Sequence, residues 1–356
     1  MSQNWMRYFE LQLLNKEGKG IGLSDFKVIF RIEWNDTKWP RVATIKVYNL
    51  SPDTSNRIMG EEFTKIQLMV GYEGMAAPVN ISDVGKVRSI NPEQAGQMDG
   101  KNYALLFQGD IRFTIKGCDN LTDSWVQIQA LGDHEAFLYA RTKKTLAAGY
   151  NVETLLNAAM EGFNAFGVTK GIIGPLPDTV FPRSRTIYAA SHVVMDQVAE
   201  MCNATWQLVD GQVQMIPVDR YIDTVVVLNG DTGLIGRPEQ TMGGGVNVRC
   251  LINPNIRINT LIHIDQASIY RAALSTSQIA QSTGRMMETN DNGYYVVKDT
   301  GAGIPPASIA ADGMYIVKSI FCIGDTRGKE WYMDLMCFAV GSADPMSGEA
   351  KQKSLP

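Results

Sequence analysis

The sequence predicts a mixed, β-rich α+β fold in which an α/β domain lies between two β-domains. Near both ends of the 356-residue chain, apolar residues recur at every second position, which is the period of a half-buried strand. In the middle of the chain the apolar period becomes that of an α-helix. A chain of this length ordinarily forms two or three domains.

The first β region contains three short alternating segments followed by two more strands. The five expected strands lie at 26–34, 43–47, 66–70, 105–115 and 125–131. Ser51 follows the second strand and is expected to cap a short helix that begins with Pro52, because the N–H that proline lacks has no intrahelical partner at that position. Residues 73–104 are rich in Gly, Pro, Asn and Ala, which predicts a long loop.

Two helices and a hairpin are predicted in the middle of the chain. Apolar residues within 152–166 share one helical face, and Asn151 is the expected N-cap. A second helix is expected at 191–202, with Ser191 as its cap. The Asp-Gly pair at 210–211 separates two alternating segments. It predicts a hairpin, because both central residues of a type I′ turn need positive φ.

Strands return after residue 224. Alternating segments occur at 246–250 and 261–265, and a final hairpin is expected from 315–323 and 331–340. A stretch rich in Gly, Pro, Ala and Asp at 282–312 predicts an inserted loop.

The two β regions resemble each other, which indicates an internal duplication. In each region an alternating strand ends in an Asn-containing turn, and a later hairpin has a Trp at the start of its return strand. We expect Trp125 and Trp331 to occupy equivalent places, with both rings on the same side of their own sheets. A shift of one residue would place one ring on the opposite face.

These patterns define the expected domain organisation. We predict a first β-domain at 1–135, a middle α/β domain at 136–223 and a second β-domain at 224–341. The loop at 282–312 is inserted into the second β-domain. The polar residues 342–356 are predicted to form a flexible tail.

Composition excludes several classes of protein. The formal net charge is −4 and the pI is near 5.5, so the chain lacks the basic excess of a dedicated nucleic-acid binder. No apolar run approaches the ~20 residues of a membrane span, and the first residues lack the pattern of a secretory signal. The five cysteines are odd in number and form no CxxC pair, which favours reduced, buried thiols.

Glycine-rich segments do not predict a phosphate or dinucleotide site. In the segment 324–330, three residues rather than four separate the glycines, and Glu330 stands where a phosphate-binding loop needs a hydroxyl. The clusters at 18–22 and 243–245 do not fit the dinucleotide spacing. We interpret all of these segments as turns or loops, and we predict no cofactor.

No catalytic or metal-binding residues are predicted. The histidines lie far apart in the sequence and form no zinc-binding or nucleophile–base motif, and they are His134, His192 and His263. Paired acids are the signature of glycoside hydrolysis, yet no aromatic pattern of a sugar cleft surrounds the acidic residues that we considered, which are Glu10, Glu61 and Glu62.

Three groups of short segments, in order along the chain, carry a family resemblance. The first is Val-Ala-Thr-Ile-Lys-Val-Tyr-Asn-Leu-Ser at 42–51, followed by segments at 71–72 and 107–111. The second comprises Thr-Gly-Leu-Ile-Gly at 232–236 and segments at 245–246 and 250–254. The third is Gly-Asp-Thr-Arg-Gly at 324–328 together with Trp331. In this order the set resembles the baseplate hub proteins of contractile-tailed bacteriophages, over roughly residues 23–341.

The resemblance implies a homotrimer whose subunits each carry two tail-tube-like β-barrel domains. Such a trimer is expected to join the sixfold tail tube, or its tube-initiator proteins, to the threefold central spike protein, beside other baseplate proteins. It would reside in the virion tail baseplate after synthesis in the host cytoplasm, with no sequence-specific nucleic acid and no membrane insertion. Two alternatives remain open. One is a tail-tip peptidoglycan hydrolase, and the other is the tail-tip hub of a non-contractile phage or phage-derived bacteriocin.

Overall fold

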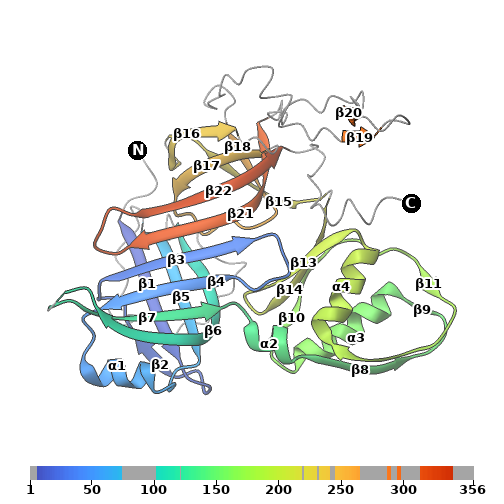
Figure 1. Cartoon of the computed structure of the whole chain (residues 1–356), viewed down its shortest axis with the longest axis horizontal. Coiled ribbons are helices and arrows are strands. Elements are labelled where there is room, and N and C mark those ends of the chain that lie inside the picture. Colours follow the sequence, from blue (N-terminus) through green and yellow to red (C-terminus); the bar gives the residue numbers. More distant parts are fainter. Residues whose placement is uncertain are drawn as a thin grey trace.

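A computed structural model describes most of the chain (Figure 1). The described residues are 6–73, 102–120, 122–218, 220–230, 232–240, 245–264, 287–289, 295–297 and 313–339. Most of the predicted loops at 73–104 and 282–312, and the whole predicted tail at 342–356, lie outside these residues. Within the described residues no helix is long and apolar enough to cross a membrane.

One sheet of thirteen strands dominates the fold, and its first part comes from the N-terminal third of the chain. The strands of this first β-unit run in the order β3-β4-β7-β6-β5-β1-β2. Their bounds are β1 (Arg7–Leu14), β2 (Gly20–Gly22), β3 (Val28–Asn35), β4 (Val42–Tyr48), β5 (Lys65–Tyr72), β6 (Asn102–Cys118) and β7 (Ser124–Leu131). The inward residues of these strands are the alternating apolar residues of the sequence, so the predicted period of two is confirmed.

Strand β6 bends and thereby joins two halves of the first unit. Its first half pairs with β5 up to Asp110, and its second half pairs with β7 from Asp110 onward. At the bend a Cβ atom on Gly109 would lie 2.6 Å from the carbonyl oxygen of Leu131, so only glycine fits there. Arg112 is the extra residue of a β-bulge between Ile111 and Phe113.

The short helix α1 (Pro52–Met59) connects β4 to β5. Its first turn is capped as the sequence predicts, since the Oγ atom of Ser51 accepts a hydrogen bond of 3.1 Å from the backbone N–H of Thr54. Ile58 anchors the helix in the core of the sheet.

The second β-unit has the same strand order as the first. It runs β16-β17-β22-β21-β18-β15. The bounds are β15 (Ile222–Leu228), β16 (Leu234–Gln240), β17 (Gly245–Leu251), β18 (Thr260–Ile264), β21 (Met314–Asp325) and β22 (Trp331–Ala339), with a separate small ladder of β19 (Met287–Thr289) and β20 (Tyr295–Val297). Taken in chain order, β15 to β22 without this ladder match β1 and β3 to β7. One pairing differs, because β15 is parallel to β18 whereas β1 is antiparallel to β5.

The matching hairpins share a bulge, and this bulge fixes their alignment. In β21 the extra residue is Lys318, between Val317 and Ser319, at the place that Arg112 holds in β6. The inward residues of β7 are Val126, Ile128 and Ala130, and those of β22 include Met333, Leu335 and Cys337. When the two hairpins are aligned by their bulges and inward faces, Arg112 is equivalent to Lys318 and Val126 is equivalent to Met333.

The expected equivalence of Trp125 and Trp331 is therefore wrong by one residue. Trp331 lies on the inward face of β22 and is 2% exposed. Trp125 lies on the outward face of β7, where its Nε1 atom donates to Asp119 at 2.8 Å. Tyr332 is the true counterpart of Trp125, and both rings face outward. A slip of one residue inverts the face of a side chain, and the sequence spacing alone could not resolve it.

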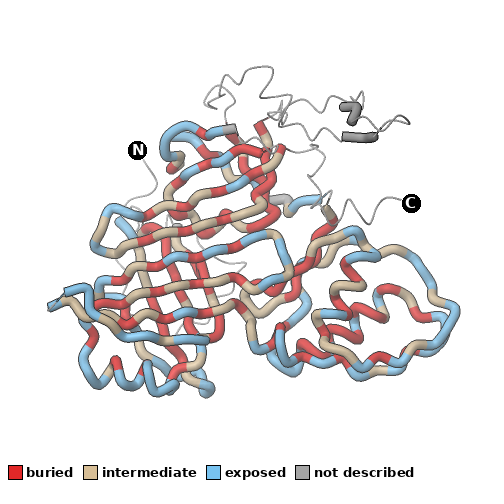
Figure 2. The backbone as a smooth tube through the Cα atoms, in the orientation of Figure 1, coloured by how far each residue is buried: buried red, intermediate tan, exposed pale blue. Residues whose placement is uncertain are grey.

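The two β-units are joined edge to edge by β3 and β21 (Figure 1). Their inward side chains form one continuous hydrophobic cluster. Figure 2 shows buried positions, in red, along the strands of both units. The β-rich α+β class is thus confirmed, with both units in a single sheet. Among the residues described, no strand pairing closes either unit into a barrel.

The middle of the chain forms a separate α/β part with its own core. It contains α2 (His134–Tyr139), β8 (Arg141–Leu146), β9 (Tyr150–Asn151), α3 (Val152–Asn164), β10 (Thr169–Ile173), β11 (Val180–Phe181), β12 (Arg185–Ala190), α4 (Ser191–Met201), β13 (Ala204–Val209) and β14 (Gln212–Pro217). The apolar faces of α3 and α4 pack against Trp206 and other residues of the β13–β14 hairpin.

Local signals in this α/β part are confirmed with one exception. Asn151 caps α3 through a bond of 2.9 Å from the Thr154 backbone N–H, and both residues of the 210–211 turn have positive φ. Ser191 is not a cap, because its hydroxyl is buried and bonds to Thr142 at 3.0 Å. The residue at the N-cap position of α4 is Ala190 instead.

The bend in β6 gives a first prediction. Replacing Gly109→Ala should lower the free energy of unfolding by about 1–3 kcal/mol, because the new methyl group overlaps the Leu131 carbonyl. Urea denaturation measures this change. Gly22→Ala is the matched control, since a Cβ atom at Gly22 meets nothing within 4 Å. Equal stability of the two variants would contradict this account of the bend.

Candidate functional site

A group of buried charged residues lies where the two β-units and the α/β part meet. The tip of the β13–β14 hairpin enters this junction and carries Asp210. Its Oδ1 atom lies 2.6 Å from Nη2 of Arg41, and its Oδ2 atom lies 3.0 Å from Nη1 of Arg257. Arg41 precedes β4 in the first unit, and Arg257 precedes β18 in the second. One carboxylate therefore links all three parts of the chain.

Burial makes this ion pair energetically important. The side chains of Arg41 and Asp210 are each 2% exposed. The Arg41 guanidinium also lies over the rings of Trp34 at 4.7 Å and Phe107 at 5.4 Å, and it donates to the Leu106 carbonyl at 3.3 Å. A charge buried in such a setting is tolerated only with its partner in place.

Asp133 accepts a hydrogen bond from the backbone of the same hairpin tip. Its Oδ2 atom accepts a bond of 3.0 Å from the Gly211 backbone N–H. Burial raises the pKa of the Asp133 carboxyl to about 6, because the charged form loses its hydration. Neighbouring Arg41 opposes this rise of the pKa, whereas Asp210 and Asp110 add to it.

A second polar cluster at the junction is centred on Lys318, the bulge residue of β21. Its Nζ atom donates to Asp36 Oδ2 and to Asn259 Oδ1, both at 2.9 Å. Asp36 Oδ1 accepts from Asn259 Nδ2 at 3.1 Å and from Thr205 Oγ1 at 2.9 Å. This cluster again contains residues from the first unit, the second unit and the α/β part.

Trp34 and Lys38 of the first unit add further links to the α/β part. Trp34 Nε1 donates to Gln207 Oε1 at 2.8 Å in a buried contact. Asp196 of α4 accepts from Trp206 Nε1 and from Lys38 Nζ, both at 2.8 Å. Because these bonds come from separate elements, the α/β part is held in one orientation on the sheet.

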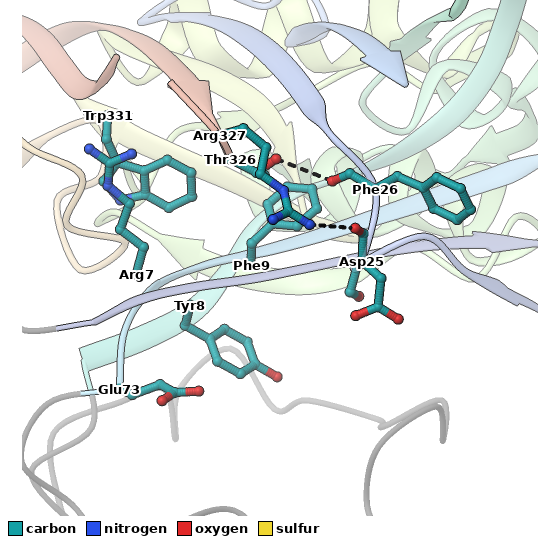
Figure 3. Close-up of a pocket in the computed structure, with 10 residues that line it drawn as sticks. Arg7, Tyr8, Phe9, Asp25, Phe26, Glu73, Thr326, Arg327 and Trp331 are labelled. Carbon is teal, nitrogen blue, oxygen red and sulfur yellow. Dashed lines mark hydrogen bonds between the residues drawn. The ribbon is translucent and has the colours of Figure 1, made fainter. Parts of the chain in front are cut away.

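A shallow pocket lies where β1 meets the turn of the β21–β22 hairpin (Figure 3). Arg7 lies over the ring of Trp331 at 5.3 Å and donates to the Gly328 carbonyl at 2.8 Å. Arg327 donates to the Asp25 carbonyl at 3.0 Å, as drawn in Figure 3. Both guanidinium groups thus bind backbone carbonyls and fasten the first unit to the second.

The residues weighed for chemistry in the sequence lie apart. Glu10 bonds to Tyr8 and Gln12 at 2.6 Å, and Glu62 pairs with Arg57. His192 stacks on Phe137 at 4.8 Å, and its Nδ1 atom lies 3.0 Å from the Phe137 carbonyl. In the part of the chain that the structure describes, no three His, Cys, Asp or Glu side chains gather as a metal site.

Sheet edges form the other candidate interaction surface. After the bulge at Arg112, the described residues contain no strand paired with the outer edge of β6. On this half of β6, Phe113 is 54% exposed and Ile115 is 38% exposed. At the opposite end of the sheet, β16 is the last strand. Large exposed apolar side chains beside an open edge are typical of a surface that pairs with another chain.

Sequence patterns missed both features. Arg41 and Arg257 were ordinary charged residues between strands, and Asp210 was assigned only to a turn. The expectation of buried thiols holds for Cys250, Cys322 and Cys337, whereas Cys118, on the open half of β6, is exposed. The feature that distinguishes Arg41 and Asp210 is the burial of their charges. That burial depends on residues far away in the sequence, so local patterns do not reveal it.

Neutralising the central carboxylate gives the second prediction. Asp210→Asn should lower the free energy of unfolding by about 3–5 kcal/mol, because Arg41 stays buried without its counter-charge. Asparagine tolerates the left-handed backbone of this turn, so the change tests charge rather than conformation. Asp334→Asn is the control, since its pair with Arg249 is partly exposed and should contribute at most about 1 kcal/mol. Similar losses in urea denaturation would contradict the junction's role.

Asp133 gives the third prediction, which concerns pH. A carboxyl whose pKa is higher in the folded state binds its proton more tightly there, so its contribution to stability falls as pH rises from about 4 to 6. Asp133→Asn removes this dependence and keeps an acceptor for the Gly211 N–H. The free energy of unfolding of the variant, relative to the parent, should therefore increase between pH 4 and pH 7. A difference that does not change with pH would argue against the raised pKa.

Comparisons with known proteins give matches among solved structures alone. No protein-family model matches the sequence, and no curated protein sequence matches it. The 43 kDa tail protein of prophage MuSo2 from Shewanella oneidensis has a TM-score of 0.47 and 9% identity, covering 94% of this chain and 98% of that chain. A tail protein from Neisseria meningitidis also has a TM-score of 0.47, with 8% identity over 95% of this chain and 98% of its own. The E. coli c3393 protein, a type VI secretion component similar to T4 tail proteins gp27 and gp5, has a TM-score of 0.43 and 5% identity over 88% and 73%. The solved structures similar to this chain thus include phage tail proteins and a type VI secretion component.

Proposed function

We propose that this chain is a structural hub of a phage tail baseplate, acting as a trimeric adaptor between the sixfold tail tube and the threefold central spike. One observation carries the proposal. Two β-units with the same strand order are joined edge to edge within a single chain. The resemblance of the sequence to baseplate hub proteins points in the same direction.

Symmetry explains why a duplicated unit suits an adaptor. A ring of three chains would present six similar β-units on one side, which matches a sixfold partner. The same ring keeps threefold symmetry wherever the two units differ, as at the α/β part. Closed rings are the usual form of symmetric homo-oligomers, so three copies of one chain can satisfy both neighbours.

The junction favours a structural role for this chain over a catalytic one. Its charged residues are paired with one another across the three parts of the chain, through Arg41, Asp210, Arg257, Asp36 and Lys318. Such contacts fix how the two units are oriented. A rigid pair of units is what a ring needs, because each unit must meet its neighbour at a fixed angle.

The proposal includes the finer expectations from the sequence. The domains are 1–135, 136–223 and 224–341, the latter with its inserted loop. The partners are other copies of this chain, the tube or tube-initiator proteins, the central spike and other baseplate proteins. The protein would act in the virion tail without catalysing a reaction.

Association of the purified chain is the fourth prediction. Mass measurement across a concentration series, with and without spike protein, should show a species of three chains. Particles of the tail should contain the chain at the junction of tube and spike.

Two results would overturn the proposed function. One is a chain that stays monomeric at every concentration and never joins a particle. The other is clearing of a peptidoglycan gel by the purified chain that is lost when one acidic residue, such as Glu10, is replaced. That second result would favour the hydrolase alternative.

A further inference from the structure

We propose that the open half of β6 in one chain pairs with β16 of a second copy, so that the joint between subunits repeats the joint between β3 and β21 inside each chain. This inference rests on the proposed ring of three chains and specifies the surfaces that would close it. The occupant of the open edge is therefore another copy of the same protein.

The internal joint shows how one edge can serve two strands. Before the bulge at Lys318, the edge of β21 pairs with β18, from Met314 to Ile316. After the bulge, the same edge pairs with β3, from Ser319 to Asp325. The bulge marks the place where one partner ends and the next begins.

The first unit has the same arrangement, but among the described residues no strand fills its second place. Before the bulge at Arg112, the edge of β6 pairs with β5. After the bulge, no described strand occupies the position that β3 holds on β21. Helix α1 lies beside β6, but within the described residues it makes no hydrogen bond to 112–118. Phe113 and Ile115 are exposed on this unpaired edge. Their counterparts in β21, Ser319 and Phe321, are partly covered, and there β3 pairs with the strand.

The complementary edge belongs to β16. β16 is the counterpart of β3 in the strand order. One edge of β3 pairs with β21, and the corresponding edge of β16 pairs with no described strand. A heterologous contact between these two different edges can close into a ring. Three such contacts would alternate with the three internal joints, so that each of the six β-units meets its neighbour through a similar edge.

One feature distinguishes the proposed joint from the internal one. β16 carries a bulge between Ile235 and Glu239 that contains Gly236 and Pro238, and proline cannot donate a ladder hydrogen bond. The joint would therefore pair on either side of this bulge. Such an edge also resists pairing with unrelated strands, which suits a chain that must first reach its ring as a soluble subunit.

Transferring the register of the internal joint gives residue positions. Arg31 lies opposite Ile323, and their counterparts are Glu239 and Gly117. Phe30 lies opposite Gly324, whose counterpart in β6 is Cys118. The bulge segment 236–238 of one chain is thus expected to face Cys118 of the next. Arg237 in that segment is exposed, and Cys118 is an exposed free thiol.

The fifth prediction uses this thiol. Arg237→Cys, treated with a short bifunctional thiol reagent, should give covalent species of two and three chains on a denaturing gel. A link within one chain is excluded, because seven strand-to-strand steps separate β16 from β6. At about 4.8 Å per step the span along the sheet is roughly 34 Å. Adding Cys118→Ser should abolish the linked species. Tyr188→Cys, placed at a site that is 78% exposed on the α/β part, should give none.

A second variant tests the open edge of β6 without a cross-linking reagent. Phe113→Asp together with Ile115→Asp should weaken trimer formation at least tenfold, because charges on an edge strand oppose pairing. Tyr188→Asp should leave it unchanged. A trimer by mass that shows neither the cross-link nor sensitivity to the β6 changes would overturn this joint while the proposed function stands. A chain that never associates would overturn both.

Discussion

The buried pairing of Asp210 with Arg41 and Arg257 is the interaction on which the arrangement of the molecule depends. Each of the three residues belongs to a different part of the chain, and the carboxylate contributes one oxygen to each arginine. Burying charges is costly unless every partner is present, so the contact forms only when the parts are correctly placed. The hairpin tip therefore adds a contact shared by all three parts to the β3–β21 pairing, which already joins the two β-units in one register.

Hydrophobic packing forms two separate cores, one in the large sheet and one in the α/β part. The inward residues of both units form one cluster across the β3–β21 joint. The α/β part keeps a separate cluster around α3, α4 and the hairpin. This division leaves the α/β part attached to the sheet chiefly through polar and indole contacts, which depend more on direction than apolar contacts do.

Sheet edges connect this architecture to assembly. An open strand edge favours aggregation unless it is bent, blocked or given a partner. In this chain β21 uses one edge for two strands, divided at the Lys318 bulge, and the same bulge recurs at Arg112. A duplicated unit that keeps the bulge also keeps the place for a second strand. The fold thus supplies both surfaces of a repeating contact, and a ring of copies is the arrangement that would use them.

Local patterns in the sequence determined the elements, and long-range contacts determined their relations. The period of two gave the strands, Ser51 and Asn151 gave two caps, and Asp210-Gly211 gave the hairpin, because each depends on nearby backbone geometry. The duplication was also visible, yet the expected equivalence of Trp125 and Trp331 was wrong by one residue. The turn of the second hairpin is one residue longer, because Cys118 pairs with Ser124 whereas its counterpart Gly324 pairs with Trp331. The role of Asp210, the burial of Arg41 and the open half of β6 were decided by tertiary structure alone. They depend on which segments, far apart in the chain, become neighbours, and charge or polarity at a single position carries no information about that.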